Sequence, residues 1–431
     1  MTSSGRFGAG YRLPIIFDSA AVVTLLYLAV TIISTVTIAK HVSVSFIEPI
    51  DLRPLDAAAS FAIILCFVPL FLIAEFSFGY LVSLSMFGMV AAFIVMSFST
   101  TREYDHGLAR LSMIAALLAF VIPALFLKVR ISLPALSPRV MDRVLYSLLA
   151  LTFVVLALDS FYGYRFGRDI FEVQMMRAEI VRPRLLEYVN GILLGAVLPF
   201  AFAYFALARR WTLAVIAALL PLAFFPMLLN KMVFFAPAWG AFLFVLFFCL
   251  RPKVAAALAL LLPMVVGLIF FMISPAASGR VLYLINIRMF AIPAAALDYY
   301  SEFFSSHPLT YFCQINVIRA VTGCPYANQL GVIMQNEYNL GNFNASLFAS
   351  EGIASLGWLA PIGTLMCGIV IGLANATAIR LSPVLVAVSS GVLVQTLMNV
   401  PLSTGLLTGG GALLFALWAI APRGSISTAK A

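Results

Sequence analysis

Long apolar runs separated by short polar segments repeat along the whole chain. A run of about 20 apolar residues crosses a bilayer as one helix. The pattern therefore predicts an all-α polytopic membrane protein with about twelve transmembrane helices, folded as one integral membrane domain over residues 1–431. The expected spans are Ser19–Ala39, Ala57–Ala74, Phe78–Phe98, Leu111–Leu127, Val144–Tyr162, Val189–Leu207, Trp211–Leu229, Val233–Leu250, Val254–Ile273, Ile353–Ala376, Pro383–Val400 and Leu406–Ala421.

The loops between these spans fall into two classes, and the short ones carry basic clusters. Positive charge in short loops favours the cytoplasmic face, so we expect that face to hold both termini. The basic clusters are Lys128 to Arg143, Arg209 and Arg210, Arg251 and Lys253, Arg380, and Arg423. Two larger loops, 163–188 and 274–352, then lie on the external face together with most acidic residues.

The larger external loop has a predicted internal structure. Residues 280–304 are apolar with intermittent charges, which favours a helix lying along the membrane interface. His307 and Pro308 end that helix, because the residue before proline disfavours helical geometry. Residues 343–356 then read as a helix that leads into the tenth span.

Composition excludes other classes of protein. The chain is 63% hydrophobic, which no soluble domain of 431 residues matches. The net charge of +9 is spread over loops rather than forming a nucleic-acid footprint. The first apolar run lacks a small-residue cleavage site behind it, so it is interpreted as a span rather than a signal peptide.

Cysteine positions predict one disulfide and no metal site. Cys66, Cys249 and Cys367 lie in spans and are expected to pack as small hydrophobic residues. Cys313 and Cys324 both lie in the external loop, where an oxidising compartment would join them; two free thiols are the alternative. No Cys/His spacing resembles a metal site, and no cofactor is expected.

Several cations are candidates for binding an anionic substrate. Arg177 and Arg288 each sit among apolar residues, where a charge needs a partner. That partner is either a structural carboxylate or a bound diphosphate, and arginine offers the bidentate geometry for the latter. Arg280 and Lys231 are expected to assist, although Lys231 could equally be a helix-end lysine that reaches toward the interface.

Candidate acid–base residues lie in the second half of the external loop. We rank Glu351 first, His307 second and Glu337 third as the base that deprotonates an acceptor hydroxyl. Glu351 could instead stabilise a helix N-terminus, and His307 could be structural. Asn342 and Asn344 could bind sugar hydroxyls or cap the following helix.

Four segments resemble those of the Wzy-type oligosaccharide repeat-unit polymerases, which assemble O-antigen or exopolysaccharide. They read RMFAIPAAALDYYSEFFSSHPLTYF from Arg288, NLGNFNASLFASEGIASLGW from Asn339, EVQMMRAEI around Arg177, and NKMVFFAPAW around Lys231. They share the order and the external side seen in that family. The paired Arg-x10-Gly repeats of some members are absent, because Gly331 lies one residue too far from Arg319.

The resemblance implies a glycosyltransferase of the bacterial inner membrane. Its substrate would be an undecaprenyl-diphosphate-linked oligosaccharide, and its partners a chain-length regulator and a repeat-unit flippase. Such a donor carries its own leaving group, which agrees with the lack of a phosphate-binding glycine loop. An O-antigen ligase and a polytopic transporter or flippase of a lipid-linked glycan are the alternatives. The short connection 208–210 between spans six and seven argues against a major-facilitator carrier.

Overall fold

The computed structural model describes residues 19–41, 47–50, 52–129, 134–165, 176, 181–274, 281–340, 343 and 346–422. The chain is 79% helical, and no strand occurs in the described ranges. Ten of the helices described are long and apolar enough to cross a membrane. The predicted all-α polytopic class is therefore confirmed.

Ten of the twelve predicted spans coincide with these long helices. Their bounds, including bends, are α1 (Ala20–His41), α2 and α3 (Pro54–Leu65, Val68–Ile73), α4 (Phe78–Met96), α5 (His106–Phe126), α6 (Pro138–Ser160), α8, η2 and α9 (Arg184–Ile192, Leu193–Val197, Leu198–Leu207), α10 (Trp211–Leu228), α11 (Lys231–Cys249), α12 (Pro252–Ile273), and η5 with α17 (Gly357–Leu359, Ala360–Ala378).

The last two predicted spans are occupied by shorter apolar helices. α18 (Pro383–Leu397) and α20 (Gly411–Ile420) are joined through α19 (Leu402–Leu407). The expected span Leu406–Ala421 is wrong as one continuous helix, because Gly410 has a φ of 78° and starts α20 after a turn. Few residues other than glycine adopt that left-handed conformation readily.

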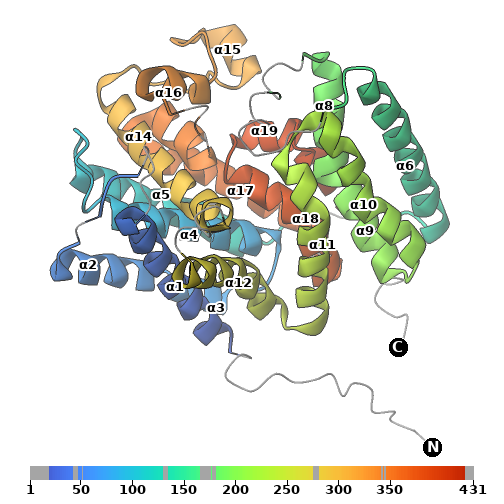
Figure 1. Cartoon of the computed structure of the whole chain (residues 1–431), viewed down its shortest axis with the longest axis horizontal. Coiled ribbons are helices and arrows are strands. Elements are labelled where there is room, and N and C mark those ends of the chain that lie inside the picture. The colour runs from blue at the N-terminus through green and yellow to red at the C-terminus, as the bar shows by residue number, and fades with distance from the viewer. Residues whose placement is uncertain are drawn as a thin grey trace, which may run out of the picture.

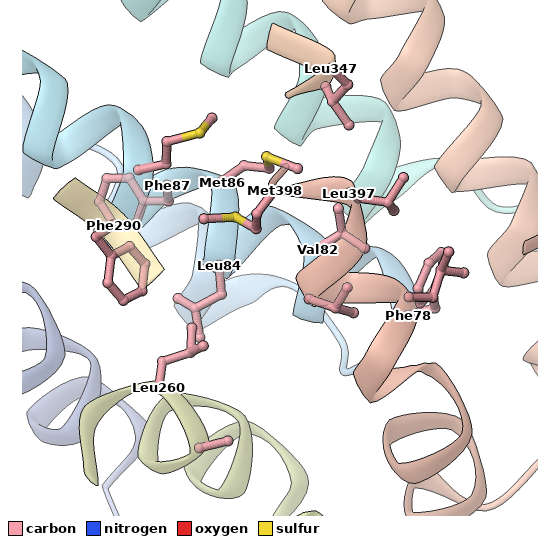
Figure 2. Packing of buried hydrophobic residues seen from close by; sticks show 14 of the residues in the cluster. Phe78, Val82, Leu84, Met86, Phe87, Leu260, Phe290, Leu347, Leu397 and Met398 are labelled. Atoms are coloured by element: carbon pink, nitrogen blue, oxygen red, sulfur yellow. The ribbon is translucent and has the colours of Figure 1, made fainter. Parts of the chain in front are cut away.

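α4 lies in the middle of the bundle and is enclosed by protein. All of its 19 residues except Leu81 are buried, and it packs against α1, α5, α14, α17 and α18. Figure 2 shows its Leu84 pointing toward Leu260 of α12, and its Phe87 near Phe290. The other spans are thus arranged around α4, and most of them present an outer side to lipid.

Contacts between loops support the predicted pairing of loops on two faces. On one face the side chain of Lys128 binds Glu75 at 3.1 Å, and Arg210 binds Asp142 at 2.9 Å. The other face carries α14 (Ile292–Ser306), α15 (Asn316–Thr322) and α16 (Leu330–Tyr338), which Figure 1 shows together at one end of the molecule. We call this end the external cap, following the predicted orientation.

The helix predicted to lie along the interface instead enters the membrane-spanning layer. It comprises η3 (Tyr283–Ala291) and α14, and it ends at Ser306 before His307 and Pro308, as predicted. Near its start, the Asn286 amide donates to the Ser34 hydroxyl and to the Met264 carbonyl, both at 2.9 Å. Ser34 precedes the end of α1 by seven residues, so Asn286 lies about 10 Å below that end at 1.5 Å per residue.

Burial explains why the interface prediction is wrong. Every residue from Ala291 to Tyr300 is buried, whereas an interfacial helix keeps one polar face in water. Asp298 lies about 18 Å further along this helix than Asn286. Its carboxylate accepts a hydrogen bond of 3.0 Å from Thr100, which lies beyond the end of α4. The helix therefore rises outward. The intermittent charges among apolar residues of this segment therefore belong to a helix that is surrounded by protein.

The inserted helix depends on a glycine in α12. A Cβ added at Gly267 would lie 1.8 Å from Asn286 Oδ1, so Gly267→Ala should displace the Asn286 amide. We expect a lower thermal unfolding midpoint in detergent, with a cost of about 1–3 kcal/mol or more, as for other overpacked sites.

The matched control is Gly240→Ala in α11, where the nearest atoms are ring carbons of Phe202 at 3.4 Å. Alanine also favours the helix there. Equal midpoints for the two variants would contradict the placement of Asn286 between α1 and α12.

Candidate functional site

The external cap is held to the spans by one arginine that the sequence analysis did not single out. Arg102 follows α4, and its guanidinium binds Glu48 at 3.3 Å, Asp298 at 3.0 Å and Glu302 at 2.8 Å. It also lies 3.5 Å from the ring centroid of Tyr299. We call these five residues the Arg102 cluster, which joins three external segments far apart in sequence.

Burial dominates the electrostatics of this cluster. It raises the pKa of Asp298 above its ordinary value, although bonds from Tyr104, Arg102 and Thr100 act in the opposite direction. The sequence showed acidic residues in facing external loops and a basic residue among them. Which loops pair depends on tertiary packing, so that signal could not identify Arg102.

A second fastening is the turn after α14. The predicted disulfide between Cys313 and Cys324 is confirmed. Beside it, Tyr311 and Phe312 have φ values of 46° and 64°, which residues other than glycine rarely adopt. Hydrogen bonds formed by the side chains of Thr310, Gln314 and Ser355 keep this turn in place.

These bonds connect the turn to η4 (Phe348–Ala354), the π-helical segment that carries Glu351. The Gln314 amide donates to the Ser350 carbonyl at 3.2 Å and to the Ser355 hydroxyl at 3.0 Å. The Thr310 backbone N–H donates to the Ala354 carbonyl at 2.8 Å. π-helical turns often occur at functional sites, and here the turn and η4 form one bonded unit.

Glu351, the first-ranked base, is buried inside this unit. Glu351 is only 4% exposed. Oε2 accepts from the Ser350 hydroxyl at 2.6 Å, and Oε1 accepts from the Leu402 backbone N–H at 3.1 Å. The carboxylate thus stabilises the start of α19, a different helix from the one the sequence suggested.

Two opposing effects act on the pKa of Glu351, and burial is the larger. Burial raises its pKa from 4.5 to about 7, and bonds from Ser350, Leu402 and Ser403 lower it by less. Glu351 precedes the tenth span, which begins at Gly357. A carboxyl group with this pKa can exchange protons near neutral pH.

His307 and Glu337 lie elsewhere on the external cap. His307 is exposed and stacks on Phe303 with ring centroids 3.9 Å apart. Its Nδ1 lies 2.9 Å from the Phe303 carbonyl, and because a carbonyl only accepts, Nδ1 is the donor in this contact. Glu337 is exposed on α16.

Arg288 lies in η3, two residues beyond Asn286. Its side chain is half-buried, and its Nε is a buried atom without a hydrogen-bond partner. None of the ion pairs among the described residues involves Arg288. The sequence left two partners open for this charge, a structural carboxylate or a bound diphosphate. Among the described residues, no carboxylate pairs with Arg288.

The smaller external loop docks beside Lys231. The Arg165 backbone N–H donates to the Pro226 carbonyl at 2.9 Å, and the Arg182 guanidinium donates to the Met227 carbonyl. Lys231 begins α11 four residues further on. The structure thus brings the described ends of this loop close to the turn that precedes Lys231.

An unforeseen buried ion pair fixes this docking. Arg182 Nε lies 3.3 Å from Oδ1 of Asp159, which is fully buried at the outer end of α6. The predicted span Val144–Tyr162 already contained Asp159, but the sequence did not show which residue pairs with its carboxylate. The remaining candidates, Arg177, Arg280, Asn342 and Asn344, lie outside the described residues.

The described helices define a multi-pass all-α membrane protein with a cap of shorter helices fastened to one end of its spans. No family model matches the chain, and neither a curated protein nor a solved structure matches it. The function is therefore argued from the residues of the site.

The pKa of Glu351 generates a prediction about stability. A carboxyl group whose folded pKa is raised contributes stability that is fully present below its unfolded pKa and is lost as pH rises through the folded pKa. Between about pH 4.5 and 7, wild type should therefore lose about 3 kcal/mol relative to Glu351→Gln, at about 1.4 kcal/mol for each pKa unit.

Thermal unfolding of both proteins in detergent across this pH range measures the effect. Glu337→Gln, an exposed carboxyl group on α16, is the matched control and should follow wild type. Parallel profiles for wild type and Glu351→Gln would contradict the burial of an ionisable carboxyl group at position 351.

Proposed function

We propose that this protein is a glycosyltransferase that polymerises undecaprenyl-diphosphate-linked oligosaccharide repeat units into surface polysaccharide. The observation that carries the proposal is the Arg288 guanidinium, which lies at membrane depth without a carboxylate among the described residues. The resemblance of the segments around Arg288 and Glu351 to the Wzy-type polymerases supports the same activity.

The depth of Arg288 fits a lipid-linked diphosphate. It lies two residues outward from Asn286, hence about 7 Å below the outer end of α1 at 1.5 Å per residue. The 22 residues of α1 span about 33 Å, close to the hydrocarbon core of about 30 Å, so the Arg288 backbone lies just inside the outer edge of that core and its long side chain can reach the headgroup layer. A diphosphate attached to a membrane lipid sits in that layer, where an unpaired arginine is costly unless it binds an anion.

The chemistry needs few protein groups. The acceptor hydroxyl oxygen attacks the anomeric carbon, the bond from that carbon to the diphosphate oxygen breaks, and the hydroxyl proton passes to a base. Arg288 would stabilise the charge that develops on the leaving diphosphate. Glu351 would accept the proton, after opening of its contact with α19 exposes the carboxylate to the acceptor.

His307 is a poorer base for this reaction centre. It follows Arg288 by 19 positions along one continuous helix, a separation of about 28 Å. A diphosphate held by Arg288 is therefore out of reach of the His307 ring. This separation argues against His307 as the base for a diphosphate held by Arg288.

The proposed setting is the outer face of the bacterial inner membrane, with both termini in the cytoplasm. The basic short loops support that orientation. Polymer length would then depend on a chain-length regulator, and repeat units would be delivered by a flippase. Arg177, Arg280 and Lys231 would add positive charge near the diphosphate, and Asn342 and Asn344 would bind sugar hydroxyls.

The role of Arg288 generates a functional prediction. In proteoliposomes supplied with lipid-linked repeat units, Arg288→Ala should abolish long polymer, and Arg288→Lys should impair it because lysine makes no bidentate contact. Arg319→Ala is the control, since Arg319 is exposed and bonds only to the Tyr326 and Ala327 carbonyls among the contacts described.

Two outcomes separate the alternatives. Normal polymer length and yield from Arg288→Ala would overturn the proposed anion site. Transfer of the glycan to a lipid A core acceptor in place of polymerisation would indicate a ligase.

Glu351 generates a second functional prediction. Glu351→Gln preserves the side-chain shape but removes the base, so polymerisation should fall by about 100-fold or more, even though burial of a neutral amide leaves the protein at least as stable at neutral pH. His307→Ala should keep most of the activity. A stable Glu351→Gln variant that polymerises normally would remove Glu351 from the mechanism.

A further inference from the structure

An apolar groove lies between the outer parts of α5 and α17. Its volume is about 260 Å³, and its described lining consists of Leu108, Leu111, Ser112, Ala115, Trp358, Leu359, Pro361 and Ile362. Ser112 is the one polar side chain among these residues, and its hydroxyl donates to the Trp358 carbonyl at 2.8 Å. The lining thus offers almost no hydrogen bonds to a polar ligand.

The groove is continuous with the membrane-facing surface of the bundle. Leu111 is 67% exposed, Trp358 63% and Ile362 52%. Below them, exposed apolar side chains continue along both spans; they are Leu118 and Ile122 on α5, and Met366, Ile369 and Leu373 on α17. In a bilayer such a surface faces lipid chains, and tryptophan is typical of the interface. The occupant is therefore a hydrocarbon chain rather than a sugar.

The groove also adjoins the unit that carries Glu351. The wall formed by η5 and α17 begins at Trp358, four residues after η4 ends at Ala354. Leu309, from the turn that bonds to η4, lies against Gly357, with its methyl carbons 3.5 and 3.6 Å from where a Cβ would be. A chain in the groove would thus emerge directly below the external cap.

We propose that this groove holds part of the isoprenoid chain of the lipid-linked substrate, at the outer end of α5 and α17 and beside the unit that carries Glu351. The assignment rests on the proposed function, which supplies a substrate with such a chain. A volume of about 260 Å³ is below the range of pockets that enclose a whole drug-sized ligand, so it suits a short length of chain whose remainder lies in the bilayer.

Ala115→Trp tests the assignment, because an indole in place of the exposed Ala115 side chain would fill the groove. Purified protein in nanodiscs is labelled with a photoreactive isoprenoid diphosphate that carries no sugar, and adducts are located by peptide mass spectrometry. We expect adducts on 108–115 and 358–362, and about tenfold less labelling of these peptides in Ala115→Trp, since overlap with the indole excludes the chain.

Val215→Trp is the matched control, because Val215 is 52% exposed on the lipid side of α10 and lies outside the groove. It should label like wild type. Unlabelled isoprenoid diphosphate should displace the probe, whereas a phospholipid with a photoreactive acyl chain should label the groove weakly. Equal labelling by both probes, or full labelling of Ala115→Trp, would overturn the assignment.

The same variant separates this assignment from the proposed function. If wild type polymerises repeat units and Ala115→Trp does so with unchanged KM and labelling, the groove assignment fails alone. If no polymer forms with any variant but the groove still labels selectively with the isoprenoid probe, the assignment stands as an isoprenoid site and the proposed function fails.

Discussion

The hydrogen bonds of Asn286 at membrane depth are the constraint on which the rest of the site depends. A helix that enters the membrane-spanning layer from outside must be surrounded by protein, because lipid cannot satisfy its polar groups. α1, α4 and α12 supply that surrounding, and the absent side chain at Gly267 leaves the space for the amide. The insertion places Arg288 about 7 Å below the outer end of α1 at 1.5 Å per residue.

The external cap is fastened at places that differ in chemistry. The Arg102 cluster joins three chain segments by charge, and the Cys313–Cys324 disulfide closes the turn after α14. The carboxylate of Glu351 ties η4 to α19 by hydrogen bonds. Of these, the Glu351 contact joins two short helical segments through a titratable side chain.

The sequence predicted the features that depend on local pattern. Apolar runs located ten spans within a few residues, and loop charges grouped contacts such as Lys128 with Glu75 on a common face. Proline after His307 marked the end of α14. Two cysteines in one external loop predicted the disulfide.

The rest required tertiary structure. A buried helix and an interfacial helix can share scattered charges, so 280–304 was assigned to the interface. The carboxylate partners of Arg102 lie from about 50 to about 200 residues away in sequence, and the partner of Asp159 lies about 20 residues away. No local periodicity encodes such pairs. The Leu402 partner of Glu351 is likewise invisible, since it is a backbone N–H on another helix.

Binding of undecaprenyl diphosphate to purified protein in nanodiscs tests the central claim most directly. The account predicts saturable binding to wild type that weakens as ionic strength rises and that is lost in Arg288→Ala but retained in Arg319→Ala. Equal affinity of wild type and Arg288→Ala for the lipid would contradict the claim that this half-buried guanidinium is the diphosphate site.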